Sequence, residues 1–137
     1  VICNDDINFD TKILEYINPT TLTNSGIIGL GGESFTINES LQYPKIQRWQ
    51  SGMDESGWGC LLFTLKSHWI QIPDDLIVWY GDNFIKDVNP IQKSILRGWK
   101  VETEMSTTTD LPELDEIKKQ DLKNWITHFN NRGRWKV

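Results

Sequence analysis

Two adjacent carboxylates near the start of the chain are the first residues whose type and spacing could do chemistry. Asp5 and Asp6 follow Asn4 and the apolar run Val1–Cys3, which we expect to form a buried strand. Ligands of open α/β sheets bind at the carboxyl ends of strands, and neighbouring carboxylates repel each other unless a cation lies between them. The pattern predicts a divalent metal site, and the alternative is an Asx turn or a helix N-cap.

A third carboxylate, Asp82, lies in the sequence Gly81-Asp82-Asn83 and has aromatic neighbours at Trp79, Tyr80 and Phe84. We expect it to be buried among these rings. Burial disfavours the charged form of a carboxyl group and so would raise its pKa towards neutrality, which suits a general base. The alternative is a turn without catalytic function, because Gly, Asp and Asn are all common turn residues.

The elements that must position these residues are predicted from apolar periodicity and from turn residues. Together they indicate one α/β domain with a mixed sheet and flanking helices. The expected strands are 1–3, 26–29, 35–37, 46–49, 60–65 and 99–103, and residues 76–80 form a further apolar run. The expected short helices are 10–17, in which Ile13, Leu14 and Ile17 share a face, and 67–70.

The C-terminal part of the chain predicts an amphipathic helix that ends near residues 130–133. Asp110 is a credible N-cap with Glu113 three residues later. We expect His128 to be a surface residue and the basic cluster Arg132, Arg134 and Lys136 to be a solvated tail. The apolar residues at helical spacing are Leu114, Ile117, Leu122, Trp125, Ile126 and Phe129.

The order of these features resembles the GT-A glycosyltransferases, particularly the large inverting family, glycosyltransferase family 2. The segment Val1–Asp10 is similar to that family's hydrophobic strand and DxD-like motif, and Gly26–Gly29 to a following strand. Gly57–Lys66 resembles the small-residue strand beneath the acceptor site, and Ile72–Phe84 resembles the stretch that presents the catalytic base. The resemblance covers about residues 1–110 and implies a GT-A-like catalytic core there, with the helix and basic tail in 111–137.

This resemblance implies a nucleotide-sugar donor and a carbohydrate or other hydroxyl acceptor. Asn4 and Asp5 would contact the donor, and Asp5 and Asp6 would hold Mn²⁺ or Mg²⁺, which offsets the charge of the leaving diphosphate. Asp82 would be the general base of a single displacement. The expected acceptor-binding residues are Trp58, Gly59, Trp79 and Tyr80, of which Trp58 is expected to be exposed between its two glycines.

Two departures from the family pattern affect the expected site. The chain starts at the DxD strand without the βαβ unit that binds the nucleoside, so we expect a partial domain completed by a preceding segment or by an oligomer partner. No histidine in Val101–Asp110 supplies a further metal or diphosphate ligand. Water or donor phosphate would therefore complete the metal shell.

Composition narrows the partners and the compartment. Nineteen acidic and fourteen basic residues give a net charge of −5, which disfavours nucleic acid because phosphate-backbone binding needs clustered Lys and Arg. No run approaches the roughly 20 apolar residues of a membrane span, and no leader pattern is present. Cys3 and Cys60 are expected to be buried thiols in the reducing cytoplasm, with a disulfide as the alternative.

Two functions of other kinds stay open at the level of sequence. The seven tryptophans and the acidic balance also suit a non-enzymatic protein-binding or immunity-type module that recognises a partner through aromatic residues. We expect Trp49, Trp69, Trp99 and Trp125 to lie in the core or at its rim. The second alternative is a metal-dependent nucleotidyltransferase, because this reaction also uses paired carboxylates and a cation.

Overall fold

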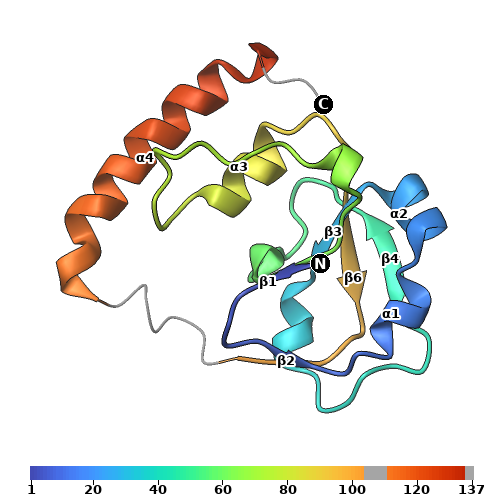
Figure 1. Ribbon diagram of the computed structural model, residues 1–137. Coiled ribbons are helices and arrows are strands. Elements are labelled where there is room, and N and C mark those ends of the chain that lie inside the picture. The colour runs from blue at the N-terminus through green and yellow to red at the C-terminus, as the bar shows by residue number, and fades with distance from the viewer. Residues whose placement is uncertain (104–110, 135–137) are drawn as a thin grey trace. The chain divides into compact units, whose positions relative to one another are not determined.

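The structure, a computed structural model, describes residues 1–103 and 111–134 and combines short strands with helices (Figure 1). The expected mixed α/β class is confirmed. Contacts divide the described residues into two compact units, residues 1–68 with 91–103 and residues 69–90 with 111–134. This grouping differs from the functional division into 1–110 and 111–137, which stays a prediction.

The first unit contains the strands of the described residues and two short helices. Its strands are β1 (Ile2–Cys3), β2 (Asn8–Phe9), β3 (Ile27–Leu30), β4 (Lys45–Arg48), β5 (Leu61–Leu62), β6 (Lys93–Arg97) and β7 (Val101–Glu102). Its helices are α1 (Ile13–Tyr16) and α2 (Pro19–Ser25), with the 3₁₀ turns η1 (Gly32–Phe35), η2 (Trp58–Cys60) and η3 (Lys66–His68).

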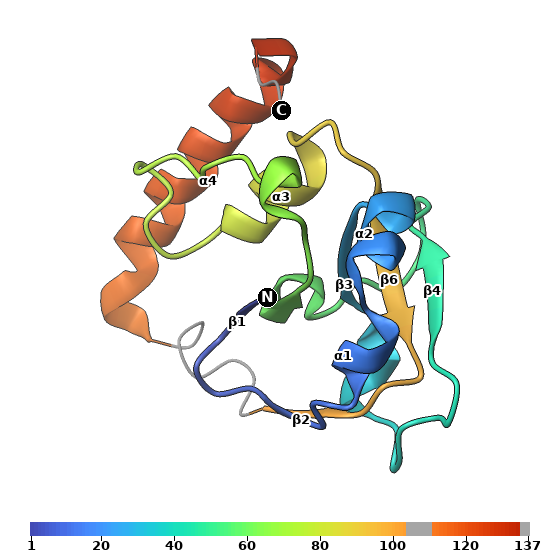
Figure 2. The same cartoon turned by 45° about the vertical axis from the view of Figure 1, so that its right-hand side comes forward.

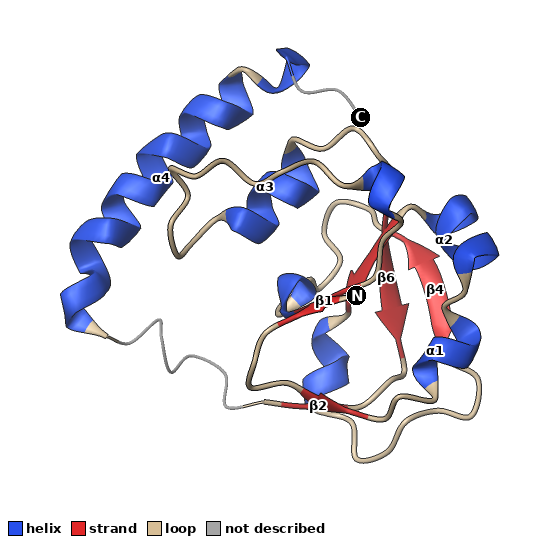
Figure 3. Ribbon diagram, in the orientation of Figure 1, coloured by secondary structure: helices blue, strands red, loops and turns tan. Residues whose placement is uncertain are grey.

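A three-stranded mixed sheet forms the core of the first unit. Strand β6 lies between β3, to which it is parallel, and β4, to which it is antiparallel (Figure 3). Buried side chains on successive positions of β3 and β6 are typical of strands covered on both faces. These side chains are Ile27, Ile28, Leu30, Ile95 and Leu96.

The helical region before β3 differs from the single helix expected at 10–17. Helix α1 covers only Ile13–Tyr16, and Asn18 begins the second helix, α2, because its side-chain oxygen accepts the Thr21 N–H at 3.0 Å. Pro19 then occupies the first helical turn, where its missing N–H is tolerated. Helix α2 contacts β3 and β4 (Figure 2). Leu14 is 46% exposed, so it does not share the buried face of Ile13 and Ile17 as expected.

The second unit consists of α3 (Gly81–Asp87) and α4 (Asp115–Asn130), with the 3₁₀ turns η4 (Pro112–Leu114) and η5 (Arg132–Arg134) at the ends of α4. Helix α3 contacts α4, and the loop that precedes α3 runs along α4 (Figures 1 and 2). The small apolar core of this unit contains Ile70, Leu76, Phe84 and Val88, with Ile72, Tyr80 and Trp125 packed against it.

The expected strand at 35–37 is wrong, and the apolar run at 76–80 forms no strand either. The run Leu76–Tyr80 forms a loop in which Ile77 and Val78 are 66% and 42% exposed. A strand needs ladder partners for its backbone, and here the carboxylate of Asp121 accepts the backbone N–H groups instead. At 35–37 the chain is in or just after the 3₁₀ turn η1 rather than in a strand.

The strand at the start of the chain forms, but it is not buried. Strand β1 pairs with β5 in antiparallel register, Ile2 opposite Leu62. Val1 and Ile2 are 66% and 39% exposed, so the expected burial is wrong. Cys3 is also exposed, and Cys60 is half-buried, which corrects the expectation of two buried thiols; these cysteines are not joined in a disulfide.

Helix α4 confirms the expected C-terminal helix, and Trp125 packs against the apolar core, but the inward face differs in part from the one expected. Leu122 and Ile126 are 38% and 44% exposed, whereas Asp121 is fully buried. The expected N-cap Asp110 and the tail residue Lys136 lie outside the described residues. Neither α4 nor another helix in the described part of the chain has the length and apolar composition needed to cross a membrane.

Candidate functional site

The paired carboxylates Asp5 and Asp6 lie on the turn that follows β1, and both are exposed. The turn is fixed at its start because the backbone N–H of Asn4 donates to the carbonyl oxygen of Cys60 at 2.9 Å. It is fixed further along by β2, which pairs with β7. Two exposed carboxylates are thus held on a turn whose backbone is anchored on both sides.

The carboxylate of Asp6 also has a side-chain partner. The hydroxyl of Thr103, the residue after β7, donates to one oxygen of Asp6 at 2.6 Å. A hydrogen bond of this kind orients a carboxylate and leaves its second oxygen able to accept another partner. The carboxylate of Asp6 is therefore oriented by a residue 97 positions later in the chain.

The donor set of this turn fits a hard divalent cation only in part. Within residues 1–103 and 111–134, no group of three or more His, Cys, Asp or Glu side chains is placed to hold a metal. Mg²⁺ in nucleotide-binding sites is commonly held by one or two carboxylates together with water and substrate phosphates. Asp5 and Asp6 are consistent with such an incomplete protein shell.

Asp82 lies on the first turn of α3 and is exposed, so its expected burial among aromatic side chains is wrong. The reason is helical geometry, because residues two apart point to nearly opposite sides of a helix. Phe84 enters the apolar core with 0% exposure, and Asp82 consequently points away from it. One carboxylate oxygen of Asp82 accepts the backbone N–H of Asn83 at 2.8 Å.

The aromatic residues before Asp82 are half-buried and are held by α4. The ammonium group of Lys118 lies 5.5 Å from the centre of the Trp79 ring. The Tyr80 ring stacks on Trp125 with centroids 5.6 Å apart and an interplanar angle of 23°. Trp79 and Tyr80, the expected acceptor-binding rings of this segment, are therefore partly exposed and are packed against side chains of α4.

Trp58 is part of the core, so the expectation that it is an exposed platform is wrong. Its side chain is 2% exposed, and its indole N–H donates to the carbonyl oxygen of Ser94 at 3.1 Å. Gly29 on β3 makes this packing possible, because an added Cβ would lie 2.6 Å from the Trp58 ring. Gly59 is half-buried in the 3₁₀ turn η2.

The expected site residues fall into two groups, one in each unit. Asn4 lies beside the turn η2 through its bond to Cys60, so the donor-side residues and Gly59 belong to one region of the first unit. Trp79, Tyr80 and Asp82 are consecutive or nearly so in the second unit.

Asp121 on α4 is a residue that sequence reasoning missed. Its carboxylate is fully buried and accepts the backbone N–H groups of Ile77, Val78 and Trp79 at 3.2, 2.8 and 2.9 Å. Burial alone would raise the pKa of Asp121, but these three hydrogen bonds together outweigh it and hold that pKa below its usual range. In the sequence Asp121 lies among Lys, Gln and Leu, a composition typical of an exposed helix face.

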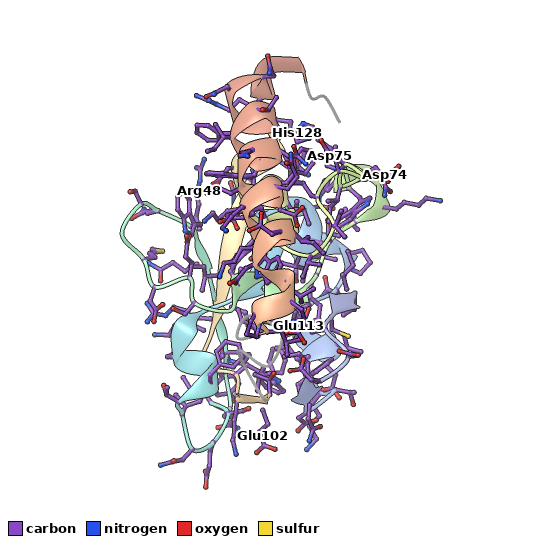
Figure 4. All side chains as sticks on the ribbon, turned by 90° about the vertical axis from the view of Figure 1, so that its left-hand side faces the viewer. Arg48, Asp74, Asp75, Glu102, Glu113 and His128 are labelled. Atoms are coloured by element: carbon purple, nitrogen blue, oxygen red, sulfur yellow. The ribbon has the colours of Figure 1, made fainter. Side chains whose placement is uncertain are left out.

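His128 is half-buried, which corrects the expectation of a surface residue. Its Nε2 lies 2.9 Å from a carboxylate oxygen of Asp75, and its ring meets Phe84 edge-on at 5.8 Å. The side-chain amide of Asn124 donates to the carbonyl oxygen of Asp75 at 2.7 Å. Figure 4 shows His128 on α4 beside Asp75 on the neighbouring loop.

Comparison of the chain with protein-family models, with curated proteins and with solved structures found no match in any of the three.

Proposed function

We propose that the protein is a glycosyltransferase of the GT-A type that transfers a sugar from a nucleotide-sugar donor to an acceptor hydroxyl with inversion. The observation that carries the proposal is the anchored turn with two exposed carboxylates, Asp5 and Asp6, the second oriented by Thr103. Such a turn is suited to a cation whose remaining ligands are substrate phosphates. The resemblance of residues 1–110 supplies the type of reaction.

On the donor side, Asp5 and Asp6 would hold Mn²⁺ or Mg²⁺, and Asn4 would contact the donor beside them. When bound, the cation supplies positive charge that offsets the negative charge gained by the leaving diphosphate. Thr103 keeps one oxygen of Asp6 engaged and so limits the rotation of its carboxylate.

On the acceptor side, Asp82 would accept the proton of the attacking hydroxyl. The acceptor oxygen forms a bond to C1 of the sugar while the bond from C1 to the phosphate oxygen breaks, and the diphosphate leaves with the electron pair. The exposure of Asp82 makes its carboxylate accessible to such a hydroxyl. Trp79 and Tyr80 would pack against the apolar face of a sugar ring. Trp58 is buried and offers no ring face to an acceptor.

The rival interpretation as a protein-binding module rested on exposed tryptophans. Of the tryptophans in residues 1–103 and 111–134, none is exposed. These tryptophans therefore do not form a broad exposed surface for a protein partner, and their partial burial is better suited to a site with a few ring faces.

A manganese titration tests the metal site directly. Mn²⁺ is paramagnetic, so we expect it to broaden the amide NMR signals of residues 4–7 before those of the rest of the first unit. The Asp6→Asn variant should weaken this binding by roughly tenfold or more, because it removes a charged ligand. Adding UDP or GDP should strengthen binding to the wild type by completing the shell.

Asp74→Asn is the matched control for this titration, because Asp74 is an exposed aspartate in the second unit. It should bind Mn²⁺ as the wild type does. Equal broadening of residues 4–7 in the wild type and in Asp6→Asn would remove the metal site and with it the main support for the proposed reaction.

A further inference from the structure

Among the described residues, Asp121 is the one charged side chain that is fully buried. A buried carboxylate costs several kcal/mol unless hydrogen bonds replace its hydration. Here the replacement comes from three consecutive backbone N–H groups, those of Ile77, Val78 and Trp79. These residues lie in neither a helix nor a strand, so the carboxylate satisfies backbone donors that have no ladder or helical partner.

The segment that Asp121 holds leads without interruption to the proposed acceptor side. Tyr80 follows Trp79 and adopts a left-handed backbone with φ of 66°, a conformation that costs a non-glycine residue free energy. The carbonyl oxygen of Tyr80 then accepts the Phe84 N–H at 2.7 Å, which starts α3 and places Asp82 on its first turn. The position of Asp82 thus depends on the backbone that Asp121 fixes.

Other residues on the same face of α4 hold the same loop. Trp125, one turn after Asp121, stacks on the Tyr80 ring, and Asn124 donates to the carbonyl oxygen of Asp75. His128 contacts the Asp75 side chain (Figure 4). Positions 121, 124, 125 and 128 follow the i, i+3, i+4, i+7 spacing of one helix face. The loop is therefore held near both of its ends by one helix.

Helix α4 buries a residue that positions the loop and leaves some of its apolar residues exposed. Leu122 and Ile126 stay substantially exposed, whereas Asp121 occupies a fully buried position on the helix. An apolar residue there would bury area without specifying where Ile77 to Trp79 lie, whereas a carboxylate with three fixed donors does specify it.

We propose that Asp121 is a positioning residue that fixes residues 77–79, so that Trp79, Tyr80 and Asp82 are presented to the acceptor hydroxyl. Its role in transfer rests on the proposed glycosyltransferase function, and it acts through the loop without touching the substrate. A misplacement of about 1 Å at such a position costs up to roughly a hundredfold in rate. The residues proposed for the donor side lie in the first unit, so we expect donor binding not to depend on this contact.

The test uses Asp121→Asn in the full-length protein, with Asp115→Asn as the control. Asp115 is an exposed aspartate on the first turn of the same helix. The Asn side chain keeps one acceptor oxygen and replaces the other with a donor, so it cannot accept all three N–H groups. We expect the amides of residues 77–79 to exchange hydrogen roughly tenfold to a hundredfold faster, while the amides of β3 and β6 keep their protection.

The kinetic readout uses the nucleotide sugar that the wild type accepts from a panel of UDP- and GDP-sugars, with methyl pyranosides as acceptors. Asp121→Asn should raise the acceptor KM by about tenfold or more and leave the donor KM unchanged. A general loss of stability would not separate these two constants. Asn124→Ala removes a weaker anchor of the same loop and should shift the exchange and the acceptor KM in the same direction by a smaller factor.

Different results contradict the positioning role of Asp121 and the glycosyltransferase activity. Unchanged exchange of residues 77–79 in Asp121→Asn, or an acceptor KM that moves no further than in Asp115→Asn, overturns the positioning role. A wild-type protein that transfers no sugar from any donor of the panel, even when the preceding segment or the oligomer partner that completes the domain is present, contradicts the glycosyltransferase instead. In that case the exchange measurement alone decides whether Asp121 fixes the loop.

Discussion

Asp82 and Phe84 lie two residues apart on α3, and the helix separates them into an exposed carboxylate and a buried ring. An exposed carboxylate is accessible to a hydroxyl that approaches from solvent, and it can accept the proton released on attack. The amide of the isosteric residue Asn cannot accept this proton. The proposed catalytic role of Asp82 is therefore separable from any packing role, because the side chain is exposed.

The substitution Asp82→Asn should lower kcat for sugar transfer by roughly a hundredfold to ten-thousandfold, the usual contribution of a general base. Donor affinity should be unchanged, since the donor-side residues lie in the first unit. Steady-state kinetics and donor titration measure the two effects. Asp74→Asn serves as the control, and wild-type turnover by Asp82→Asn would rule out the role.

Trp58 shows why residue type alone does not place a side chain. Its two glycine neighbours are the signal from which exposure is expected, yet Gly57 has a φ of 72° and an added Cβ there would collide with the Phe35 ring. Close packing and an unusual backbone angle thus explain why residue 57 is a glycine. The space for the Trp58 indole is left by Gly29, which is far away in the sequence. Only the folded chain shows that contact.

The existence of helix α4 was predictable because its apolar residues repeat over four turns. Which of its residues face the core was predictable only in part. Periodicity ranks Leu122 and Ile126 as inward and Asp121 as outward, whereas the loop at 77–79 reverses that order by supplying three donors to the carboxylate. Strand β6 was missed because basic residues at both its ends, Lys93 and Arg97, interrupt the apolar pattern. The first error arises because backbone far away in the sequence determines the environment of Asp121, and the second because the apolar run of β6 is short.

The contact between α4 and the loop should make the stability of the second unit depend on pH. Burial acts to raise the pKa of Asp121, but the bonds from Trp79, Val78 and Ile77 prevail and lower it. The folded pKa therefore lies below the unfolded value of about 3.9. The stabilisation is fully present above that value and is lost as pH falls through the folded pKa.

Urea unfolding of the wild type and of Asp121→Asn at a series of pH values measures this contribution. The wild type should be more stable by roughly 2 kcal/mol near neutral pH, the magnitude of a hydrogen bond to a charged group. The difference should stay constant down to about pH 5 and shrink below about pH 4 as the carboxylate is protonated. A difference that persists or grows in acid would show that the ionised form is not the stabilising one.

At the scale of the whole molecule, the mixed α/β class follows from local patterns, whereas the grouping into two units does not. Residues 69–90 belong with α4, and residues 91–103 return to the first unit and supply β6 and β7. No local period encodes such a return, because it depends on pairing between β3 and β6, which are about 65 positions apart. The paired aspartates, by contrast, were correctly expected at a strand end because Asn4, Asp5 and Asp6 follow β1 directly.

The products of the reaction test the function of the molecule as a whole. A single displacement, with Asp82 taking the proton and diphosphate leaving, inverts the configuration at C1, whereas two successive displacements through a covalent intermediate would retain it. We therefore expect a nucleoside diphosphate and a glycoside of inverted configuration, measured by phosphorus NMR and by the anomeric proton coupling. Pyrophosphate in place of nucleoside diphosphate would assign the protein to the nucleotidyltransferases, and a retained anomer would exclude Asp82 as the base of a one-step transfer.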